Sequence, residues 1–445
     1  MDRAGVTRSP GGRDDHRALM AAVRAASAEV GRPVGIMVDL SGPKIRVGEL
    51  EAPMQLEAGQ TVVMAPEDIA VRGEISTTYS PLAEEIQAGD RVLLDDGLLE
   101  LSCTGTEGER TRLEVVRGGL LKGRKGINLP LVDIRAPSLT EKDLADLDFA
   151  LTEGVEYTAL SFVRRAEDVV DLKARVGNRA LVVAKIEKVQ ALRAIEEILP
   201  ETDAVMVARG DLGVELPFER VPLAQKRIIQ LSNFYARPVI TATQMLESMI
   251  EHARPTRAEA SDVANAILDG TDAVMLSAET AMGAHPVAAV NTMREIALSV
   301  EKSPRYERRP RLKLNTIDAT FGTAIAMAAA QVARALRLDK VICFTESGGT
   351  VRLISRYRPG NEIIGLSPNL GVVRQMTVLG HVRPALFRRE TSLEEMFDMA
   401  AEMLVVRKMA ELGQEVVFVA GVPPGVVSST NVMKLHRIGE STKLS

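Results

Sequence analysis

The feature that most constrains the fold is a series of short apolar segments that alternate with helical segments. These segments are "YTALSFV", "ALVVAKIE", "DAVMVAR", "RPVITAT" and "DAVMLSA", and each is followed by a stretch with helical spacing. Strands that are apolar on both faces and separated by helices are typical of a parallel sheet. With the earlier segment "VGIMVDL" they make six strand–helix units, whereas a closed parallel barrel has eight.

The start of the chain offers little material for the two remaining units. Its first 15 residues are polar and are interrupted by Pro10, Gly11 and Gly12. We expect this stretch to be too short to supply two strands. The sequence therefore predicts a barrel without its first two strands, with two strand edges left unpaired unless another chain covers them.

Two other regions are predicted to form separate domains. Short alternating strands with turn signals, such as "QTVVMAP" and "DRVLLDDGLLELSC", predict a small β domain inserted into the barrel. After the charged, proline-bounded stretch "PRYERRP", strands and helices alternate again, which predicts an open α/β sheet. The predicted division is a barrel domain (1–50 and 131–303), an inserted β lid domain (51–130), a linker (304–314) and a C-terminal α/β domain (315–445).

Composition narrows the class of protein. A chain of 445 residues with 46% hydrophobic and 26% charged residues has an ordinary globular composition. The net charge of −5, without a basic block, argues against a nucleic-acid partner. The chain has no apolar run as long as a membrane span and no signal peptide at its polar start. Its two cysteines, Cys103 and Cys343, are far apart in the sequence. We expect a cytoplasmic protein without a membrane partner.

Charged residues stand where the apolar strands end. Lys185 and Glu187 are two residues apart on one strand, so they point to the same face. Arg209 and Asp211 follow the next strand, and in a parallel barrel such strand ends converge on the catalytic mouth. Two carboxylates from neighbouring strands suit Mg²⁺ or Mn²⁺. Lys185 would then face negative charge that develops on a phosphoryl group or an enolate.

An alternative interpretation is that these four residues form salt bridges that cap the sheet. The next two strands, however, also end in polar side chains, Thr243 on one and Ser277 and Glu279 on the other. Polar groups at successive strand ends favour an active site.

Several motifs, in order along the chain, resemble the signatures of the pyruvate kinase family. They include "DLSGPKIRVG", "KGINLP", "AKIE", "MVARGDLGVE", "ATQMLESM" and "FTESGGTVRLISRYRP", and the resemblance extends over residues 34–440. It implies a TIM (β/α)8-type barrel, a mobile β lid, a C-terminal α/β regulatory domain and a homotetramer. It also implies a glycolytic kinase that transfers a phosphoryl group from phosphoenolpyruvate to ADP, producing pyruvate and ATP.

The resemblance also implies roles for single residues. Glu187 and Asp211 would bind the divalent metal, and Lys185 would stabilise the phosphoryl group and the enolate. Thr243 would lie near the face where carbon is protonated, and Ser277 would belong to a water relay. The other implied positions are the backbone of Ala208, Arg209 and Gly210 for the substrate carboxylate together with Asp211, Lys125 for the nucleotide phosphates, and Arg46 as a further catalytic residue.

One local variation concerns the monovalent cation. Potassium-dependent family members resemble Asp-Thr followed by Gly-Pro-Glu in this stretch, whereas this chain has Asp39, Leu40 and Lys44. Because a lysine ammonium can replace a monovalent cation electrostatically, we expect that K⁺ is not required. The alternative is that Lys44 is a solvated charge.

The C-terminal motif "FTESGGT" suggests a phosphate site. Thr345, Ser347, Gly348 and Thr350 lie between a strand and a helix, where backbone N–H groups are free to bind an anion. The resemblance implies a phosphorylated allosteric effector there, although Gly349 stands where Arg or Lys is common. A plain capped turn is the alternative. In the same comparison Leu131 replaces a usual glycine after "INLP", which predicts a stiffer lid hinge.

The beginning of the chain departs from the family pattern. Family members have an Arg-x-Asn-Phe-Ser-His-Gly stretch there, to which Arg8 or Ser9 corresponds only with an arbitrary gap. Either the chain starts inside a longer reading frame, or it is a shortened relative that has lost catalysis. We favour the first because Lys185, Glu187 and Asp211 are retained.

Two other functions are open on the sequence alone. A metal-dependent lyase that handles pyruvate enolates on a similar barrel would use the same pair, Glu187 and Asp211. The inserted lid argues against it, because a lyase has no second nucleotide phosphate to enclose. A non-catalytic phosphometabolite-binding subunit is supported only by the departure at the N-terminus.

Overall fold

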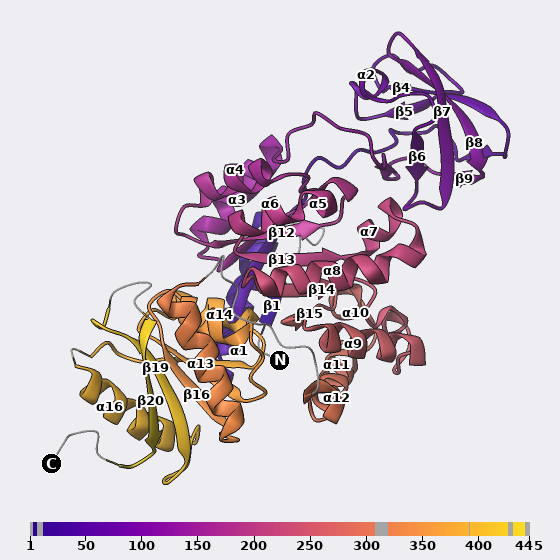
Figure 1. The fold of residues 1–445 in the computed structure, drawn as a ribbon. Helices are drawn as coiled ribbons and strands as arrows, with labels where there is room; N and C mark the ends of the chain where they lie inside the picture. The colour runs from indigo at the N-terminus through magenta and orange to yellow at the C-terminus, as the bar shows by residue number, and fades with distance from the viewer. Residues whose placement is uncertain (1–2, 7–11, 308–318, 391, 426–429, 441–445) are drawn as a thin grey trace.

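Seven parallel strands form the central sheet of the barrel region. The structure, a computed structural model, describes residues 3–6, 12–307, 319–390, 392–425 and 430–440. The sheet order is β1-β2-β11-β12-β13-β14-β15, with β1 and β15 at its two edges (Figure 1). These strands are β1 (Arg3–Val6), β2 (Gly35–Leu40), β11 (Tyr157–Leu160), β12 (Leu181–Ile186), β13 (Ala204–Ala208), β14 (Val239–Ala242) and β15 (Ala273–Val274). The predicted barrel-type fold with a parallel sheet is confirmed.

The strand β1 corrects one expectation. We expected no strand from the first 15 residues, but Arg3–Val6 pairs in parallel with β2, with Arg3 opposite Gly35 and Val6 opposite Val38. Four residues suffice because β2 supplies the hydrogen-bonding partner along the whole strand. The positions Arg8, Ser9, Pro10 and Gly11, which we discussed above, lie outside the described residues. The described sheet therefore falls one strand short of eight, rather than two.

Helices cover the outer face of this sheet. Apolar residues such as Leu160, Val182 and Val207 point outward and pack against α3, α4, α6 and α8 in one buried cluster. The helices of the barrel region are α1 (Arg13–Val30), α3 (Glu141–Thr152), α4 (Ala166–Val176), α5 (Val189–Arg193), α6 (Ile195–Glu201), α7 (Arg209–Glu215), η1 (Phe218–Arg220), α8 (Val221–Phe234), η2 (Glu247–Ile250), α9 (Arg257–Asp269), α10 (Ala278–Ala281), α11 (Pro286–Glu301) and α12 (Pro304–Glu307). None of the described helices is long and apolar enough to cross a membrane.

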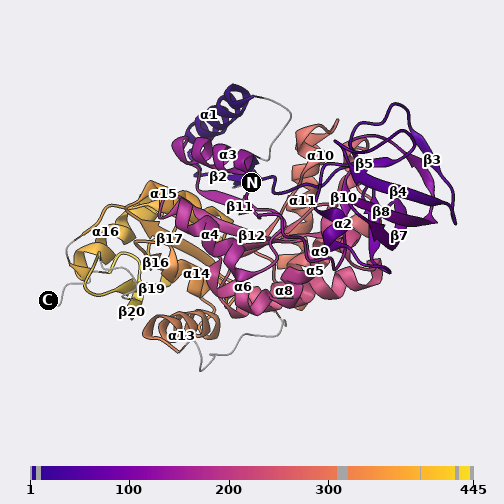
Figure 2. The same cartoon turned by 90° about the horizontal axis from the view of Figure 1, so that it is seen from above.

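The inserted lid is a separate β structure with its own core. It projects away from the barrel in both views (Figures 1 and 2). It contains a six-stranded sheet, ordered β10-β6-β7-β8-β4-β5, and a β3-β9 pair. Its elements are β3 (Met54–Leu56), β4 (Thr61–Pro66), β5 (Ile75–Thr77), α2 (Leu82–Glu85), β6 (Arg91–Leu94), β7 (Leu99–Glu107), β8 (Arg110–Arg117), β9 (Gly119–Leu121) and β10 (Ile127–Asn128). Alternating residues such as Leu99, Leu101 and Cys103 face inward.

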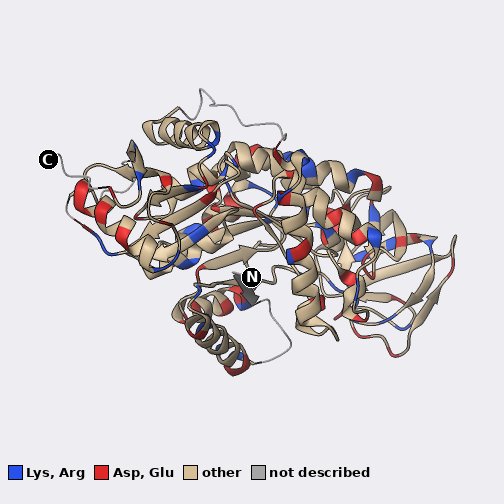
Figure 3. Cartoon of the chain, turned by 90° about the horizontal axis from the view of Figure 1, so that it is seen from below, with Lys and Arg blue, Asp and Glu red and all other residues tan. Residues whose placement is uncertain are grey.

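The C-terminal region is an open sheet of five strands, ordered β18-β17-β16-β19-β20, in which only β20 is antiparallel to its neighbour. Its elements are α13 (Phe321–Ala335), β16 (Lys340–Phe344), α14 (Gly349–Ser355), β17 (Glu362–Ser367), α15 (Leu370–Gln375), η4 (Met376–Val378), β18 (Val382–Leu386), α16 (Leu393–Val406), β19 (Glu415–Gly421) and β20 (Thr430–Arg437). Of the predicted linker 304–314, residues 308–314 lie outside the described part of the chain. Lys/Arg and Asp/Glu are interspersed over the barrel, lid and C-terminal regions (Figure 3).

The C-terminal region packs against the end of the barrel sheet at which the strands begin. The hydroxyl of Tyr157, the first residue of β11, donates a hydrogen bond to the carbonyl oxygen of Gln375 at 2.6 Å. Met37 and Met206 share a buried cluster with Val351 and Met376. The C-terminal region therefore does not cover the opposite end of the sheet, where the strands finish and where the predicted site residues lie.

A buried ion pair joins the same two regions. The guanidinium of Arg358 contacts the Asp272 carboxylate at 2.7 Å, and both side chains are less than a tenth exposed. Burial alone would raise the pKa of Asp272, but Arg358 and the amides of Gly380 and Val239 outweigh it, so the pKa is lowered. The ionised carboxylate therefore stabilises the folded chain.

We predict that Asp272→Asn lowers the free energy of unfolding by about 3–5 kcal/mol at pH 7, because Arg358 loses its buried partner. Since the pKa of Asp272 is lowered on folding, its contribution is present above the unfolded pKa of about 4 and is lost as the pH falls through the lower folded pKa. The difference between the two proteins, measured by urea unfolding, should therefore shrink below pH 4. The exposed Asp68→Asn is the control, and a pH-independent difference would contradict this account.

Candidate active site

The centre of the site is Lys185, near the carboxyl end of β12. Its ammonium donates hydrogen bonds to Asp39 Oδ2 at 3.1 Å and to Ser161 Oγ at 2.7 Å, and it lies 3.5 Å from Glu187 Oε2. Asp39 lies on β2, and Ser161 follows β11 directly. Because β2, β11 and β12 are neighbours in the sheet, their ends bring these groups together.

The charges of this cluster depend on one another. Burial would lower the pKa of Lys185, but the carboxylates of Glu187, Asp39 and Asp211 outweigh it and raise this pKa, so the ammonium stays charged. Burial raises the pKa of Glu187 to about 7; Lys185 opposes the shift, whereas Asp211 and Asp39 add to it. The site therefore contains a permanent cation beside a carboxylate whose charge responds to its surroundings.

Glu187 has a carboxylate oxygen that could bind a cation. One of its oxygens, Oε1, accepts a hydrogen bond from the amide of Phe162 at 2.6 Å. The buried Oε2 lies 3.5 Å from the Lys185 ammonium and accepts no hydrogen bond from any residue that the structure describes. Among the described residues no group of three His, Cys, Asp or Glu could hold a metal. Glu187 and Asp211 supply two carboxylates, and a hard cation that takes its remaining ligands from substrate and water fits this donor set. An unsatisfied buried oxygen of this kind supports such a partner.

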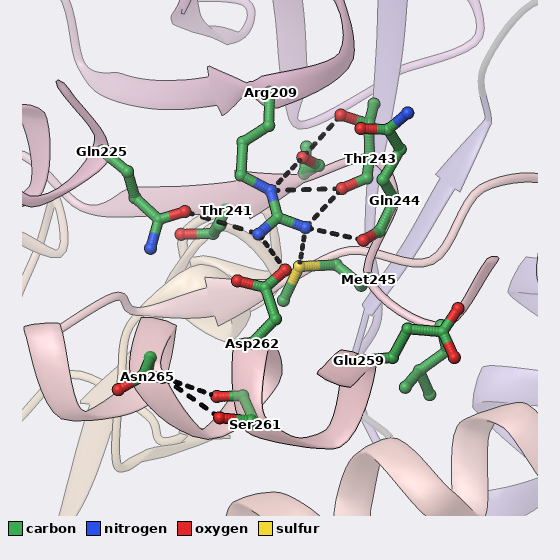
Figure 4. A network of polar contacts seen from close by, with 12 residues as sticks. Arg209, Gln225, Thr241, Thr243, Gln244, Met245, Glu259, Ser261, Asp262 and Asn265 are labelled. Carbon is green, nitrogen blue, oxygen red and sulfur yellow. Dashed lines mark hydrogen bonds and ion pairs between the residues drawn. The ribbon is translucent and has the colours of Figure 1, made fainter. Parts of the chain in front are cut away.

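The side chain of Arg209 does not take part in this cluster, in contrast to our expectation that its charge faces the mouth. Figure 4 shows its guanidinium surrounded by Asp262, Gln225 and the segment after β14. It donates to the carbonyl oxygens of Thr243 at 2.6 Å and Gln244 at 2.9 Å. For this side chain the alternative interpretation, a salt bridge that caps the sheet, agrees with the contact to Asp262. The reason is that α7 begins at Arg209 itself and directs its side chain into the core.

Arg209 instead supports the backbone around Thr243. Thr243 and Gln244 have φ values of +63° and +51°, which are unfavourable for residues with a side chain. The hydrogen bonds from Arg209 to both carbonyl groups stabilise this conformation. As a result Thr243 Oγ1 accepts a hydrogen bond from the amide of Gly210 at 2.8 Å. The structure thus brings together Thr243 and the backbone after Ala208, as the sequence suggested.

Ser277 lies in the turn that follows β15. Its amide donates to Glu279 Oε2 at 2.7 Å, and the amide of Leu246 donates to the other oxygen of that carboxylate at 3.1 Å. Glu279 is 3% exposed. It therefore ties the turn with Ser277 to the segment after Thr243.

Two further predicted site residues, Lys125 on the lid side and Arg46, do not contact Lys185. Lys125 forms an ion pair with Asp95 at 2.7 Å within the lid. The exposed Arg46 donates to the carbonyl oxygen of Arg124 at 3.1 Å, at the junction with the lid. A cleft between lid and barrel is lined by Lys44, Asp96, Lys188 and Asp211, among others.

The three residues on which the prediction about K⁺ rests, Asp39, Leu40 and Lys44, have different surroundings. Asp39 binds Lys185, and Lys44 lines the cleft together with Asp211. Leu40 is 1% exposed and packs in the core between the sheet and the helices. Of these three residues, Asp39 and Lys44 therefore face the mouth of the barrel, and Leu40 does not.

Two groups of the site were missed from the sequence, namely the hydroxyl of Ser161 and the amide of Phe162. The rule that identified Lys185 and Thr243, polar groups at the ends of apolar strands, would also have found Ser161 in "YTALSFV". No sequence signal points to the amide of Phe162, because any residue carries one.

The loop "FTESGGT" borders a cavity of about 410 Å³ in the C-terminal region. Gly348 has a φ of +82° and donates its amide to Thr345 Oγ1 at 2.9 Å, and Thr350 lies at 2.6 Å from Thr430, Oγ1 to Oγ1. The cavity lining also includes Ser347, Arg352, Arg388 and Arg389, of which Arg389 is paired with Glu346 at 2.6 Å.

Fold and site together define an α/β-barrel enzyme whose polar groups meet at the carboxyl ends of the strands. Residues 4–290 match the family described as "Pyruvate kinase, barrel domain", and residues 323–436 match "Pyruvate kinase, alpha/beta domain". The chain therefore belongs to the pyruvate kinase family.

Individual relatives agree over nearly the whole chain. Proteins named pyruvate kinase from Mycobacterium intracellulare and Mycobacterium tuberculosis H37Rv are each 44% identical and cover 99% of this chain and 93% of the relative. A pyruvate kinase from Corynebacterium efficiens is 42% identical, with 100% and 94% covered. The crystal structure of a pyruvate kinase from Cryptosporidium parvum superposes with a TM-score of 0.90 at 34% identity, covering 98% of this chain and 91% of that one.

These findings confirm the resemblance that the motifs indicated, and with it the class of enzyme, a phosphotransferase. They favour a kinase over a lyase on a similar barrel.

Proposed function

We propose that this chain transfers the phosphoryl group of phosphoenolpyruvate to ADP, giving pyruvate and ATP, as a step of glycolysis. The observation that carries the proposal is the ammonium of Lys185, held among Asp39, Ser161 and Glu187 at the mouth of the barrel. Phosphoryl transfer depends mainly on positioning and on neutralising charge, and this arrangement supplies both.

Each group near Lys185 has a definite task in this proposal. Glu187 and Asp211 would hold Mg²⁺ or Mn²⁺, which supplies positive charge to the substrate oxygens when bound. Lys185 would stabilise the transferring phosphoryl group and then the enolate, because its raised pKa keeps it charged. It is thus suited to electrostatic stabilisation rather than to proton transfer.

The remaining residues would bind and protonate substrate. The backbone of Ala208, Arg209 and Gly210 would receive the substrate carboxylate, since α7 begins there and the first amides of a helix have no partner within the helix itself. Thr243 would lie at the face of the enolate where carbon is protonated, with Ser277 in a water relay.

Lid residues would act from the other side of the cleft. Lys125 would reach the nucleotide phosphates, which requires it to leave Asp95. Arg46, at the lid junction, would turn toward substrate when the lid closes. The backbone of Leu131 has a φ of +70°, a value that few residues with a side chain adopt, which supports the expectation of a stiffer hinge.

We further propose a cytoplasmic homotetramer, divided into the barrel, lid, linker and C-terminal domains predicted from the sequence. Both cysteines are free and buried, as suits a reducing compartment.

We predict that Lys185→Met lowers kcat by about 100- to 1,000-fold, because the developing charge loses its main counter-charge. The measurement is pyruvate formation from phosphoenolpyruvate and ADP with Mg²⁺, coupled to lactate dehydrogenase. Lys173→Met, which removes a lysine of α4 that is paired with Asp203, is the matched control. Wild-type turnover by the Lys185 variant would refute the proposal, and a folded but inactive native chain would favour a non-catalytic binding subunit.

We predict that the native chain is fully active without K⁺, because Lys44 supplies a positive charge to the cleft that Asp211 also lines. Lys44→Glu should make activity depend on added K⁺, measured in buffers in which NaCl balances the ionic strength. Lys122→Glu, at an exposed lid position, controls for the change in charge. A strict K⁺ requirement of the native chain would show that Lys44 is only a solvated charge.

We also propose that the cavity beside Thr345, Ser347, Gly348 and Thr350 binds a phosphorylated effector. Its size, its arginines and the amides at the start of α14, which the N-cap residue Gly348 does not cap with a side chain, support this role. The Glu346 carboxylate is paired with Arg389 and would therefore compete with a phosphate group for this arginine.

We predict that Glu346→Gln binds inorganic phosphate about two- to fivefold more tightly than the native chain, because a partly exposed ion pair no longer competes for Arg389. Isothermal titration calorimetry measures the affinity, with Glu411→Gln as the exposed control. Absence of phosphate binding to either protein would instead indicate a plain capped turn.

A further inference from the structure

The turn that follows β11 contacts Lys185 of β12 and Glu187, which comes directly after β12. Ser161 is 3% exposed, and its hydroxyl lies between two charged groups. It accepts a hydrogen bond from the Lys185 ammonium at 2.7 Å and donates one to Asp39 Oδ1 at 3.2 Å. The next residue, Phe162, donates its amide to Glu187.

This turn has little freedom to move. Phe162 has a φ of +56°, and its ring lies 5.6 Å from the ammonium of Lys188. Gly42 packs so closely that a Cβ there would lie 2.8 Å from the Phe162 ring and 3.5 Å from Ser161 Cβ. The hydroxyl of Ser161 is therefore held in place by the backbone of its own turn and by the segment that contains Gly42.

The chemistry of Ser161 differs from that of the other partners of Lys185. Asp39 and Glu187 are carboxylates, which attract the ammonium but also neutralise its charge. A hydroxyl accepts a hydrogen bond without carrying charge, so it directs the ammonium and leaves its charge available. The hydroxyl proton is donated to Asp39, so the oxygen lone pairs remain for Lys185.

We propose that Ser161 is a positioning residue for Lys185: its hydroxyl fixes the direction of the ammonium and keeps it from turning fully onto the neighbouring carboxylates. A lysine side chain has four carbons and a compact charge, so its position is not fixed by its own stereochemistry. Without Ser161 the ammonium would pair more closely with Glu187 and Asp39, away from the reacting oxygens. The effect should appear in the chemical step rather than in substrate binding.

Ser161→Ala is expected to lower kcat by about 10- to 100-fold, the range of one hydrogen bond to a charged group. The KM for phosphoenolpyruvate and the affinity for Mn²⁺, measured by calorimetry, should each change less than about twofold, because the amide of Phe162 still orients Glu187. Ser161→Thr keeps the hydroxyl and should retain most of the native kcat. Ser161→Cys keeps the size and weakens the acceptor, so it provides the same test should the alanine variant fail to fold.

Ser232→Ala is the matched control. Ser232 is a fully buried serine of α8 whose hydroxyl has no hydrogen-bond partner in the described part of the chain, and its loss should leave kcat unchanged. The proposal is overturned if folded Ser161→Ala or Ser161→Cys has native kcat, or if KM or Mn²⁺ affinity changes as much as kcat. It is also overturned if Ser161→Thr folds normally and is as slow as Ser161→Ala.

Discussion

The pairing of the Lys185 ammonium with side chains from neighbouring strands is the interaction on which the site depends. A buried cation is tolerated only where carboxylates and hydrogen-bond acceptors surround it. Here Asp39, Ser161 and Glu187 provide these partners, and each comes from the end of β2, β11 or β12. The parallel sheet is what makes the arrangement possible, because parallel strands end on the same edge.

The two ends of the sheet have different tasks. At the end where the strands begin, Tyr157, Asp272 and their partners attach the C-terminal region. At the other end the lid and the polar groups enclose a cleft. Stability and chemistry are thus separated along the strands, as is usual in parallel barrels. β11 takes part in both, with Tyr157 at one end and Ser161 just beyond the other.

Much of the candidate site could be predicted from the sequence because its residues follow apolar strands. This rule and the family motifs predicted Lys185, Glu187, Asp211 and Thr243 as site residues, and the structure places Lys185 beside Glu187. The rule failed for Arg209, since position after a strand does not say whether a side chain turns to the mouth or into the core. The strand β1 was missed for a different reason. Four residues are too few to give a periodic signal, and only their pairing with β2 makes them a strand.

The sequence by itself determined the parallel sheet, the inserted lid, the open C-terminal sheet and the family, because periodicity and motifs are local properties of the chain. Tertiary structure alone decided which groups meet. Arg209 is paired with Asp262, 53 residues away, and Lys185 shares Ser161 with Asp39, which lies on a strand 146 residues from it. The physical reason is that hydrogen bonds and burial act over a few ångströms in space, whatever the separation along the chain.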